Sequence, residues 1–270
     1  MNEISYSAEY RALRMKFDVL REQVANQIEM LQHLVTTVGP NLKAHYMLEI
    51  GQFENRVYEL KTDVSRWQRR FTLRQMALNR GEKPDYGAIE AELDGEFREY
   101  LEKIREHIEE LKEASALCHS ESFTDEETTA IRNAYLDAVK KLHPDLNPDL
   151  PQEAVNLWHR IQKAYEDRDW ANVKFLAALV EDVVTGKIEF GDDADGIEEL
   201  KRRIESLVGR SDELAKRTAE LRSHVPFTYE EFLKDEEEVG LRKRTLLAEI
   251  AELESVIKEY EKLWLEGIRR

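Results

Sequence analysis

The sequence has few of the residues that interrupt helices and almost no cysteine. Among 270 residues there are 11 glycines, 6 prolines and 1 cysteine. Scarce glycine and proline favour long helices, because both residues destabilise helix interiors. The lone Cys118 excludes a disulfide framework and a metal site built from several cysteines of one chain. It also fits a reducing compartment, so we expect a cytoplasmic protein.

Other features are missing as well. No run of about 18 apolar residues is present, so the sequence predicts no membrane span. Residues 1–5 have neither the basic nor the apolar region of a secretory signal, and we expect none. A glycine-rich phosphate loop and a nucleophile elbow are both absent, so we expect a non-enzymatic protein without a cofactor. His107, Cys118 and His119 offer too few ligands to predict a metal site.

Charge is abundant and mainly acidic. Charged residues make up 36% of the chain, and 56 acidic against 40 basic residues give a net charge of −16. Such a charge argues against wrapping nucleic acid, although a local basic patch could still bind it. Arginines interleave with Trp67 and Phe71 over residues 66–80. Because these two aromatics fall on buried helical positions, we favour a solvated arginine face over a nucleic-acid site.

The N-terminal part predicts long helices that bury one stripe each. Apolar residues recur there at spacings of three, four or seven, which is typical of a helix with one buried face. The first stripe comprises Tyr10, Leu13, Phe17, Leu20, Val24, Ile28, Leu31 and Val38. Gly39-Pro40 should end that helix, and Gly81 with Pro84 should end the second. Because short links make neighbours antiparallel, a three-helix bundle or an extended hairpin is expected.

The C-terminal part shows the same pattern. Heptad-like stripes run through residues 197–268 and predict a second antiparallel hairpin, in which Tyr260 and Trp264 are core or dimer contacts. The fold class is therefore all-α, with long antiparallel coiled-coil helices flanking a small helical hairpin. We place the domain boundaries at 1–119 for an N-terminal bundle, 120–185 for a central module, 186–196 for an acidic linker and 197–270 for the C-terminal hairpin. The coiled-coil stripes also allow a homodimer.

The central module departs from the heptad pattern. Thr124 and Glu127 form a capping box that should begin a helix. That helix should end near His143, because Pro144 disfavours the α conformation in the residue before it. Asp149 with Gln152 can begin the next helix, and a short third helix is expected over residues 171–183. The loop between the first two helices should form an exposed, proline-stiffened tip suited to recognition.

Residues 120–185 resemble a J-domain. The motifs that carry the resemblance are Ala134-Tyr135-Leu136-Asp137-Ala138-Val139-Lys140-Lys141-Leu142-His143-Pro144-Asp145, then Asn147-Pro148-Asp149, then Trp158, Ile161, Ala164 and Tyr165. Residues Leu136, Asp137 and Leu146 stand where the family usually has basic side chains, so the chain resembles a divergent member. The family's first helix would have to lie near Leu111–Cys118.

The resemblance implies a function. J-domains bind ATP-driven chaperones of the DnaK type and stimulate ATP hydrolysis. His143, Pro144 and Asp145 would be the trigger, with Asp145 accepting a charge-assisted hydrogen bond from an arginine of the chaperone. Lys140 and Lys141 would dock by charge, and Tyr135 completes the predicted chaperone-binding set. The coiled-coil arms would hold an unidentified client.

An alternative interpretation makes no use of the chaperone. The chain would then be a coiled-coil adaptor, and its J-like segment would be degenerate. In this case Pro144 merely ends a helix and Asp145 caps the turn locally.

Overall fold

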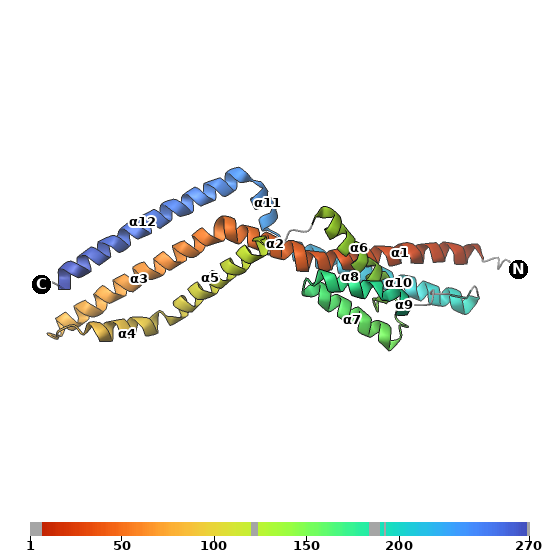
Figure 1. Cartoon of the computed structure of the whole chain (residues 1–270), viewed down its shortest axis with the longest axis horizontal. Helices are drawn as coiled ribbons and strands as arrows, with labels where there is room; N and C mark the ends of the chain where they lie inside the picture. The colour runs from red at the N-terminus through yellow and green to blue at the C-terminus, as the bar shows by residue number, and fades with distance from the viewer. Residues whose placement is uncertain (1–6, 120–123, 184–189, 192, 269–270) are drawn as a thin grey trace. The chain divides into compact units, whose positions relative to one another are not determined.

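A computed structural model of the chain describes residues 7–119, 124–183, 190–191 and 193–268. All the secondary structure in these residues is helical, which confirms the predicted all-α class (Figure 1). The chain divides into two compact units, each made of two separate stretches of sequence. The first unit comprises Met1–Pro40 with Glu121–Phe227, and the second comprises Asn41–Ser120 with Thr228–Arg270. These limits differ from the predicted boundaries because each unit joins an N-terminal helix to a C-terminal one.

In the first unit two long helices, α1 (Ala8–His33) and α10 (Ala194–Arg222), pack along each other (Figure 1). They run in the same direction. Lys201 Nζ lies 2.8 Å from Glu9 Oε1 near their beginnings, and Gln23 Nε2 donates to Ser211 Oγ at 3.1 Å further along both helices. Their shared core includes Phe17, Val24, Ile28, Leu200, Ile204, Leu207 and Leu214.

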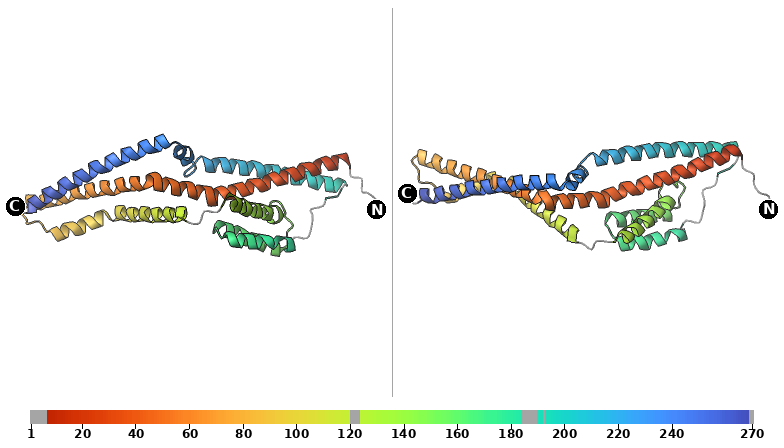
Figure 2. Two further views of the ribbon diagram at one scale, coloured as in Figure 1. Left: turned by 45° about the horizontal axis from the view of Figure 1, so that its top comes forward. Right: turned by 90° about the horizontal axis from the view of Figure 1, so that it is seen from above.

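The shorter helices of the first unit gather on one side of this pair (Figure 2). They are α6 (Asp125–Leu142), α7 (Gln152–Glu166), α8 (Trp170–Ala178) and α9 (Val180–Val183). The capping box is present: Thr124 Oγ1 accepts from the backbone N–H of Glu127, whose Oε2 accepts from the backbone N–H of Thr124. The predicted apolar faces of α6 and α7 join the core of α1 and α10.

Gly39-Pro40 does not end a helix, contrary to the prediction. A π-helical turn, η1 (Leu34–Val38), leads directly into α2 (Gly39–Tyr46). A proline inside an α-helix clashes with the carbonyl four residues earlier, and for Pro40 that residue is Thr36, within the wider π turn that accommodates it. Gly39 serves close packing, because an added Cβ would lie 3.2 Å from the Phe227 ring.

The second unit is built around α3 (Gln52–Asn79), which follows the π-helical turn η2 (Met47–Gly51). Helix α3 ends before Gly81, whose φ of 74° suits glycine, and α4 (Tyr86–Glu96) and α5 (Arg98–His119) return antiparallel to it. After α11 (Tyr229–Lys234), helix α12 (Glu236–Ile268) packs along α3 (Figure 2).

Helix α12 runs parallel to α3. Arg242 Nη2 pairs with Glu54 Oε1 at 2.5 Å, and Gln68 Nε2 donates to Tyr260 Oη at 3.3 Å, so positions advance together along both helices. The predicted hairpin of residues 197–268 is therefore wrong, because the apolar stripes of its two helices are buried by α1 and α3 instead. Antiparallel packing holds for α3 with α4 and α5, as expected from their short link.

The structure also differs from two predictions about the ends of the central module. Residues 111–118, expected as the first helix of the J-like module, belong to α5 in the second unit; α1 is the long helix that packs on α6. Of the predicted linker 186–196, residues 186–189 and 192 lie outside the described residues, as do residues 1–5. Residues 194–196 already belong to α10, whose first turn is capped by the Asp193 side chain.

Candidate functional site

The loop after α6 is fixed by its flanking residues. Helix α6 ends at Leu142, which is fully buried, and His143 adopts an extended backbone with φ −68° and ψ 128°. That conformation is the one a residue preceding proline prefers, so the helix ends where Pro144 predicts. Leu146 is only 2% exposed and anchors the middle of the loop in the core. The tripeptide His143-Pro144-Asp145 therefore has a defined shape.

His143 is held in a neutral form. Its ring meets Trp158 edge-on with centroids 5.1 Å apart, and its Nδ1 accepts the backbone N–H of Asp145 at 3.1 Å. An Nδ1 that accepts cannot carry a proton, so this geometry assigns the neutral tautomer with hydrogen on Nε2. Burial lowers the pKa of His143, the Asp145 carboxylate opposes this shift, and the positive charge of Arg210 adds to it.

Asp145 is paired within the chain. Its Oδ2 lies 2.5 Å from Nε of Arg210, which comes from α10. The same guanidinium donates through Nη1 to Glu213 Oε2 at 2.7 Å. The side chains of Asp145 and Arg210 remain 37% and 29% exposed, so the pair sits at the surface beside a partly buried histidine. The arginine that the J-domain resemblance would place on a chaperone is thus matched here by one of the chain's own arginines.

Two more arginines reach the same loop. Arg21 of α1 donates through Nη2 to the carbonyl of Lys140 at 2.6 Å and to Asn147 Oδ1 at 2.7 Å. Arg203 of α10 donates through Nη2 to Asp149 Oδ2 at 2.9 Å. We call Arg21, Arg203 and Arg210 the arginine clasp. The loop is exposed at its proline and aspartate positions, as expected, but it is not the free tip that the sequence predicted.

Asp149 does not begin α7. The N-cap of α7 is Pro151, which makes no side-chain capping bond. The Asp149 carboxylate turns to Arg203 instead, because a guanidinium on the neighbouring helix offers a charge-assisted hydrogen bond.

The remaining predicted binding residues have different surroundings. Lys140 Nζ pairs with Glu22 of α1 at 2.6 Å, and Lys141 pairs with Glu181 of α9. Tyr135 is 1% exposed and packs against Tyr165 with ring centroids 4.1 Å apart. Tyr135 is therefore a core residue in this structure, and its part in chaperone binding stays a prediction.

An open groove lies beside α6. It has a volume of about 280 Å³, and alanines of α6 and α8 are among the residues that line it. Asp137 and Lys141 line it from α6, while Lys174 and Glu181 line it from the facing helices. The groove presents charges of both signs and does not favour a partner of either sign.

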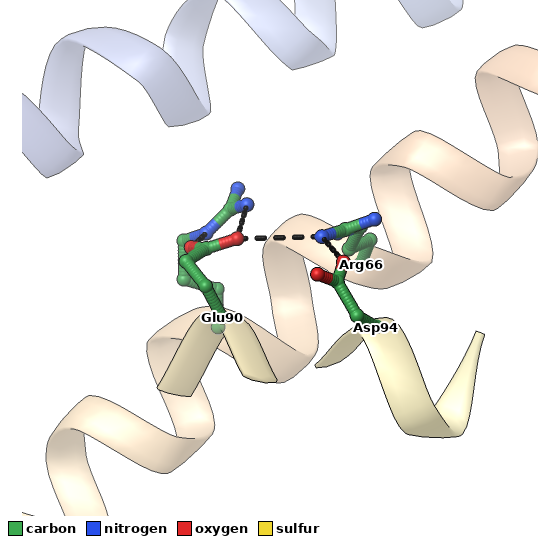
Figure 3. A network of polar contacts seen from close by, with 4 residues as sticks. Arg66, Glu90 and Asp94 are labelled. Atoms are coloured by element: carbon green, nitrogen blue, oxygen red, sulfur yellow. Dashed lines mark hydrogen bonds and ion pairs between the residues drawn. The ribbon is translucent and has the colours of Figure 1, made fainter. Parts of the chain in front are cut away.

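The arginines of α3 pair with acids of α4 rather than forming a solvated face. Arg66 binds both Glu90, at 3.3 Å, and Asp94, and Arg70 Nε lies 2.6 Å from Glu90 Oε1 (Figure 3). The Arg66 and Arg70 side chains are 20% and 13% exposed. Hydrogen bonding from Arg70 holds the pKa of Glu90 below its ordinary value. The arginines of α3 therefore stabilise the packing of α4 on α3.

Arg69, Arg74 and Arg80 are also engaged. Arg69 Nη2 pairs with Glu96 Oε1 at 2.6 Å, and Arg80 Nε pairs with Glu82 Oε2 at 2.9 Å. Arg74 donates to the carbonyl of Gly267 at 2.6 Å. The acids of α4 were the signal in the sequence for the pairs of Arg66, Arg69 and Arg70, because they lie across a short link from these arginines.

The aromatic residues of the second unit pack with one another. The Trp264 ring lies 5.4 Å from Phe71 and 6.2 Å from Trp67, and Tyr260 lies 5.7 Å from Phe71. Arg70 sits over the Trp67 ring at 4.2 Å. Trp264 and Tyr260 are half-buried and pack against aromatic residues of α3 within the unit, and the predicted dimer contact stays a prediction.

Over the described residues, no three His, Cys, Asp or Glu side chains are placed to hold a metal ion. The side chain of His119, one of the three ligands considered, lies outside the described residues. Within the described helices, none is long and apolar enough to cross a membrane.

Comparison of the chain with protein-family models, with curated proteins and with solved structures found no match.

The arginine clasp was not predicted from the sequence. Arg203 and Arg210 are seven residues apart and so share one face of α10, but that spacing also fits a solvated heptad position. Only the parallel packing of α10 against α1 brings them to a loop that follows α6. The sequence around Arg21 likewise did not indicate a contact with this loop.

Proposed function

We propose that the chain is a co-chaperone of a divergent J-domain type, which binds a DnaK-type ATPase and stimulates its ATP hydrolysis. The protein itself would catalyse no reaction and would act in the cytoplasm. Surfaces of the long helices would hold a client or partner.

The observation that carries this proposal is the ion pair of Asp145 with an arginine. The trigger of a J-domain would need a carboxylate that an incoming guanidinium can reach. The Asp145 carboxylate is 37% exposed and already pairs with one guanidinium, that of Arg210, so its surroundings suit an arginine partner although Arg210 must give way to another one. Pro144 limits the backbone freedom that the loop would lose on binding, which increases the value of a small contact.

The neighbouring residues support distinct roles. The hydrogen bond from the Asp145 backbone N–H to Nδ1 holds the His143 ring against the backbone of the loop. Lys140 and Lys141 lie in the last turn of α6 with side chains 29% and 36% exposed, where a negatively charged chaperone surface could compete with Glu22 and Glu181 for them. Tyr135 would act only by holding α6 against α7.

The test is a single-turnover ATPase assay with a purified DnaK-type chaperone and the full chain. Asp145→Asn and His143→Gln should keep the helical content and thermal stability of the wild type but lose the stimulation. Glu153→Gln is the matched control, because it removes an exposed carboxylate in the first turn of α7, outside the triplet and the loop. Equal stimulation by the wild type and the Asp145 variant would refute the proposal.

The alternative is a non-enzymatic coiled-coil adaptor with a degenerate J-like segment. One observation favours it: both lysines of the predicted docking face already have acidic partners, Glu22 and Glu181, in the same unit. An adaptor should capture no DnaK-type chaperone in a pull-down and should bind its partner equally well with Asp145→Asn. Sedimentation would show whether its helices also form a homodimer. Loss of partner capture in Asp145→Asn would exclude the adaptor.

A further inference from the structure

Both aspartates of the loop are held by one face of α10. Arg210 pairs with Asp145 and Arg203 with Asp149, and these arginines are seven residues apart, which is two helical turns. Helix α10 itself is anchored elsewhere, since Leu200, Ile204 and Leu207 are buried against α1. The contacts with the loop are therefore made by long polar side chains that can move while the helix stays in place.

Each of these arginines has a second carboxylate on its own helix. Arg210 Nη1 donates to Glu213 at 2.7 Å, and Arg203 Nε donates to Glu199 at 2.7 Å. An arginine that leaves the loop therefore keeps a partner at helical spacing. The usual cost of leaving a charge unpaired is avoided, so the arginine has two acceptable arrangements.

An incoming arginine would need the same oxygen of Asp145. Arg210 already lies against Oδ2, so a second guanidinium would have to share the carboxylate with it, and the two positive charges would repel each other. If the loop can bind a partner only while the arginines are away from it, its apparent dissociation constant is the intrinsic constant divided by the fraction of molecules in which the loop is free. The clasp thus lowers the apparent affinity of the loop for any guanidinium-bearing partner.

We propose that Arg203 and Arg210 autoinhibit the His143-Pro144-Asp145 loop, and that they release it by leaving Asp149 and Asp145 while they stay bound to Glu199 and Glu213. The occupant that displaces them is an arginine-bearing surface of the chaperone partner, so this inference rests on the proposed function. The switch needs only side-chain rotation and no separation of α10 from α1.

The experiment compares variants that act in opposite directions. Arg203→Ala with Arg210→Ala opens the clasp, whereas Glu213→Gln with Glu199→Gln removes the alternative partners and should keep it closed. Arg217→Ala is the matched control, because Arg217 lies one heptad beyond Arg210, is exposed and makes no ion pair among the described residues. Two quantities are measured for each full-length variant: amide hydrogen exchange of residues 143–149, and the protein concentration that gives half-maximal ATPase stimulation of a DnaK-type chaperone.

The open variant should show faster exchange in the loop and a half-maximal concentration lower by about threefold or more. The closed variant should shift that concentration upward, and Arg217→Ala should match the wild type in both measurements. Unchanged exchange in the open variant overturns the inference without reference to any chaperone. Faster exchange with unchanged or weaker stimulation also overturns it, since the arginines would then position the loop. If exchange rises but neither wild type nor open variant stimulates at all, the proposed function itself fails and the autoinhibition fails with it.

Discussion

Oδ2 of Asp145 lies 2.5 Å from Nε of Arg210, which joins the loop after α6 to helix α10. The same Asp145 donates its backbone N–H to Nδ1 of His143 at 3.1 Å. A negative charge and a positive charge from different elements thus act on one partly buried imidazole. Their effects on that ring have opposite signs, which gives a direct way to detect the ion pair in solution.

The pKa of His143 should lie below its ordinary value of 6.5, because burial disfavours the charged ring. Arg210→Ala should raise this pKa by removing a positive charge and some burial, whereas Asp145→Asn should lower it further. An NMR titration of the ring proton resonances measures both changes. pKa shifts of the same sign in the two variants would show that Asp145 and Arg210 do not act on the His143 ring in solution as they do in the structure.

The lowered pKa also sets a pH dependence of stability. Below pH 6.5 the unfolded chain binds the His143 proton more readily than the folded chain does. The contribution of neutral His143 to the free energy of unfolding is therefore fully present above that pH and is lost as the pH falls. His143→Gln should flatten the stability profile on the acidic side of pH 6.5.

Tyr135 should prove to be a structural residue. Because its side chain is 1% exposed, Tyr135→Ala should reduce the free energy of unfolding of the first unit by about 3–5 kcal/mol. Met15→Ala is the control, since Met15 is 70% exposed on α1 and should change stability by less than about 0.5 kcal/mol. Urea unfolding followed by Trp158 and Trp170 fluorescence, with Trp67 and Trp264 replaced by Phe, isolates this unit. A change near that of Met15→Ala would place Tyr135 outside the core.

Glu29 and Arg132 should be energetically coupled across α1 and α6. The Glu29 side chain is 7% exposed and accepts two hydrogen bonds, from Nε of Arg132 at 2.7 Å and from its Nη2 at 2.9 Å. Arg132→Met leaves the carboxylate buried without that partner, so it should cost about 1.5–3 kcal/mol. The double variant with Glu29→Leu should cost clearly less than the sum of the single variants. A double-mutant cycle measures this difference, and strict additivity would contradict the pair.

The parallel packing of helices can be tested by zero-length crosslinking. Carbodiimide joins an amine to a carboxylate only when the two groups are in contact. It should link Lys201 to Glu9 and Lys61 to Glu249, whose atoms lie 2.8 and 2.7 Å apart. Peptide mass spectrometry of the monomer identifies both links, and Lys61→Gln should remove only the second. Links that pair the start of α3 with the end of α12 would instead support an antiparallel arrangement.

Much of the local structure was predictable from particular residues. Thr124 with Glu127 began α6, Pro144 ended it, and Gly81 followed the end of α3, because capping and proline sterics depend only on near neighbours. Apolar spacing identified buried residues such as Ile161 and Val139. The same spacing could not reveal that Pro40 continues a helix, since the compensating π turn has no plain signal in the sequence.

The sequence alone determined that the chain is all-α, where α6 begins and ends, where α3 ends, and that the long helices bury apolar stripes. These properties follow from backbone sterics and from hydrophobic spacing along one element. Only the tertiary structure decided that α10 pairs with α1 and that α12 pairs with α3, both in parallel. An apolar stripe indicates that a helix packs against another helix, but it does not identify that other helix. The arginine clasp depends on that choice, and so the charge environment of His143 and Asp145 could not be derived from their own segment.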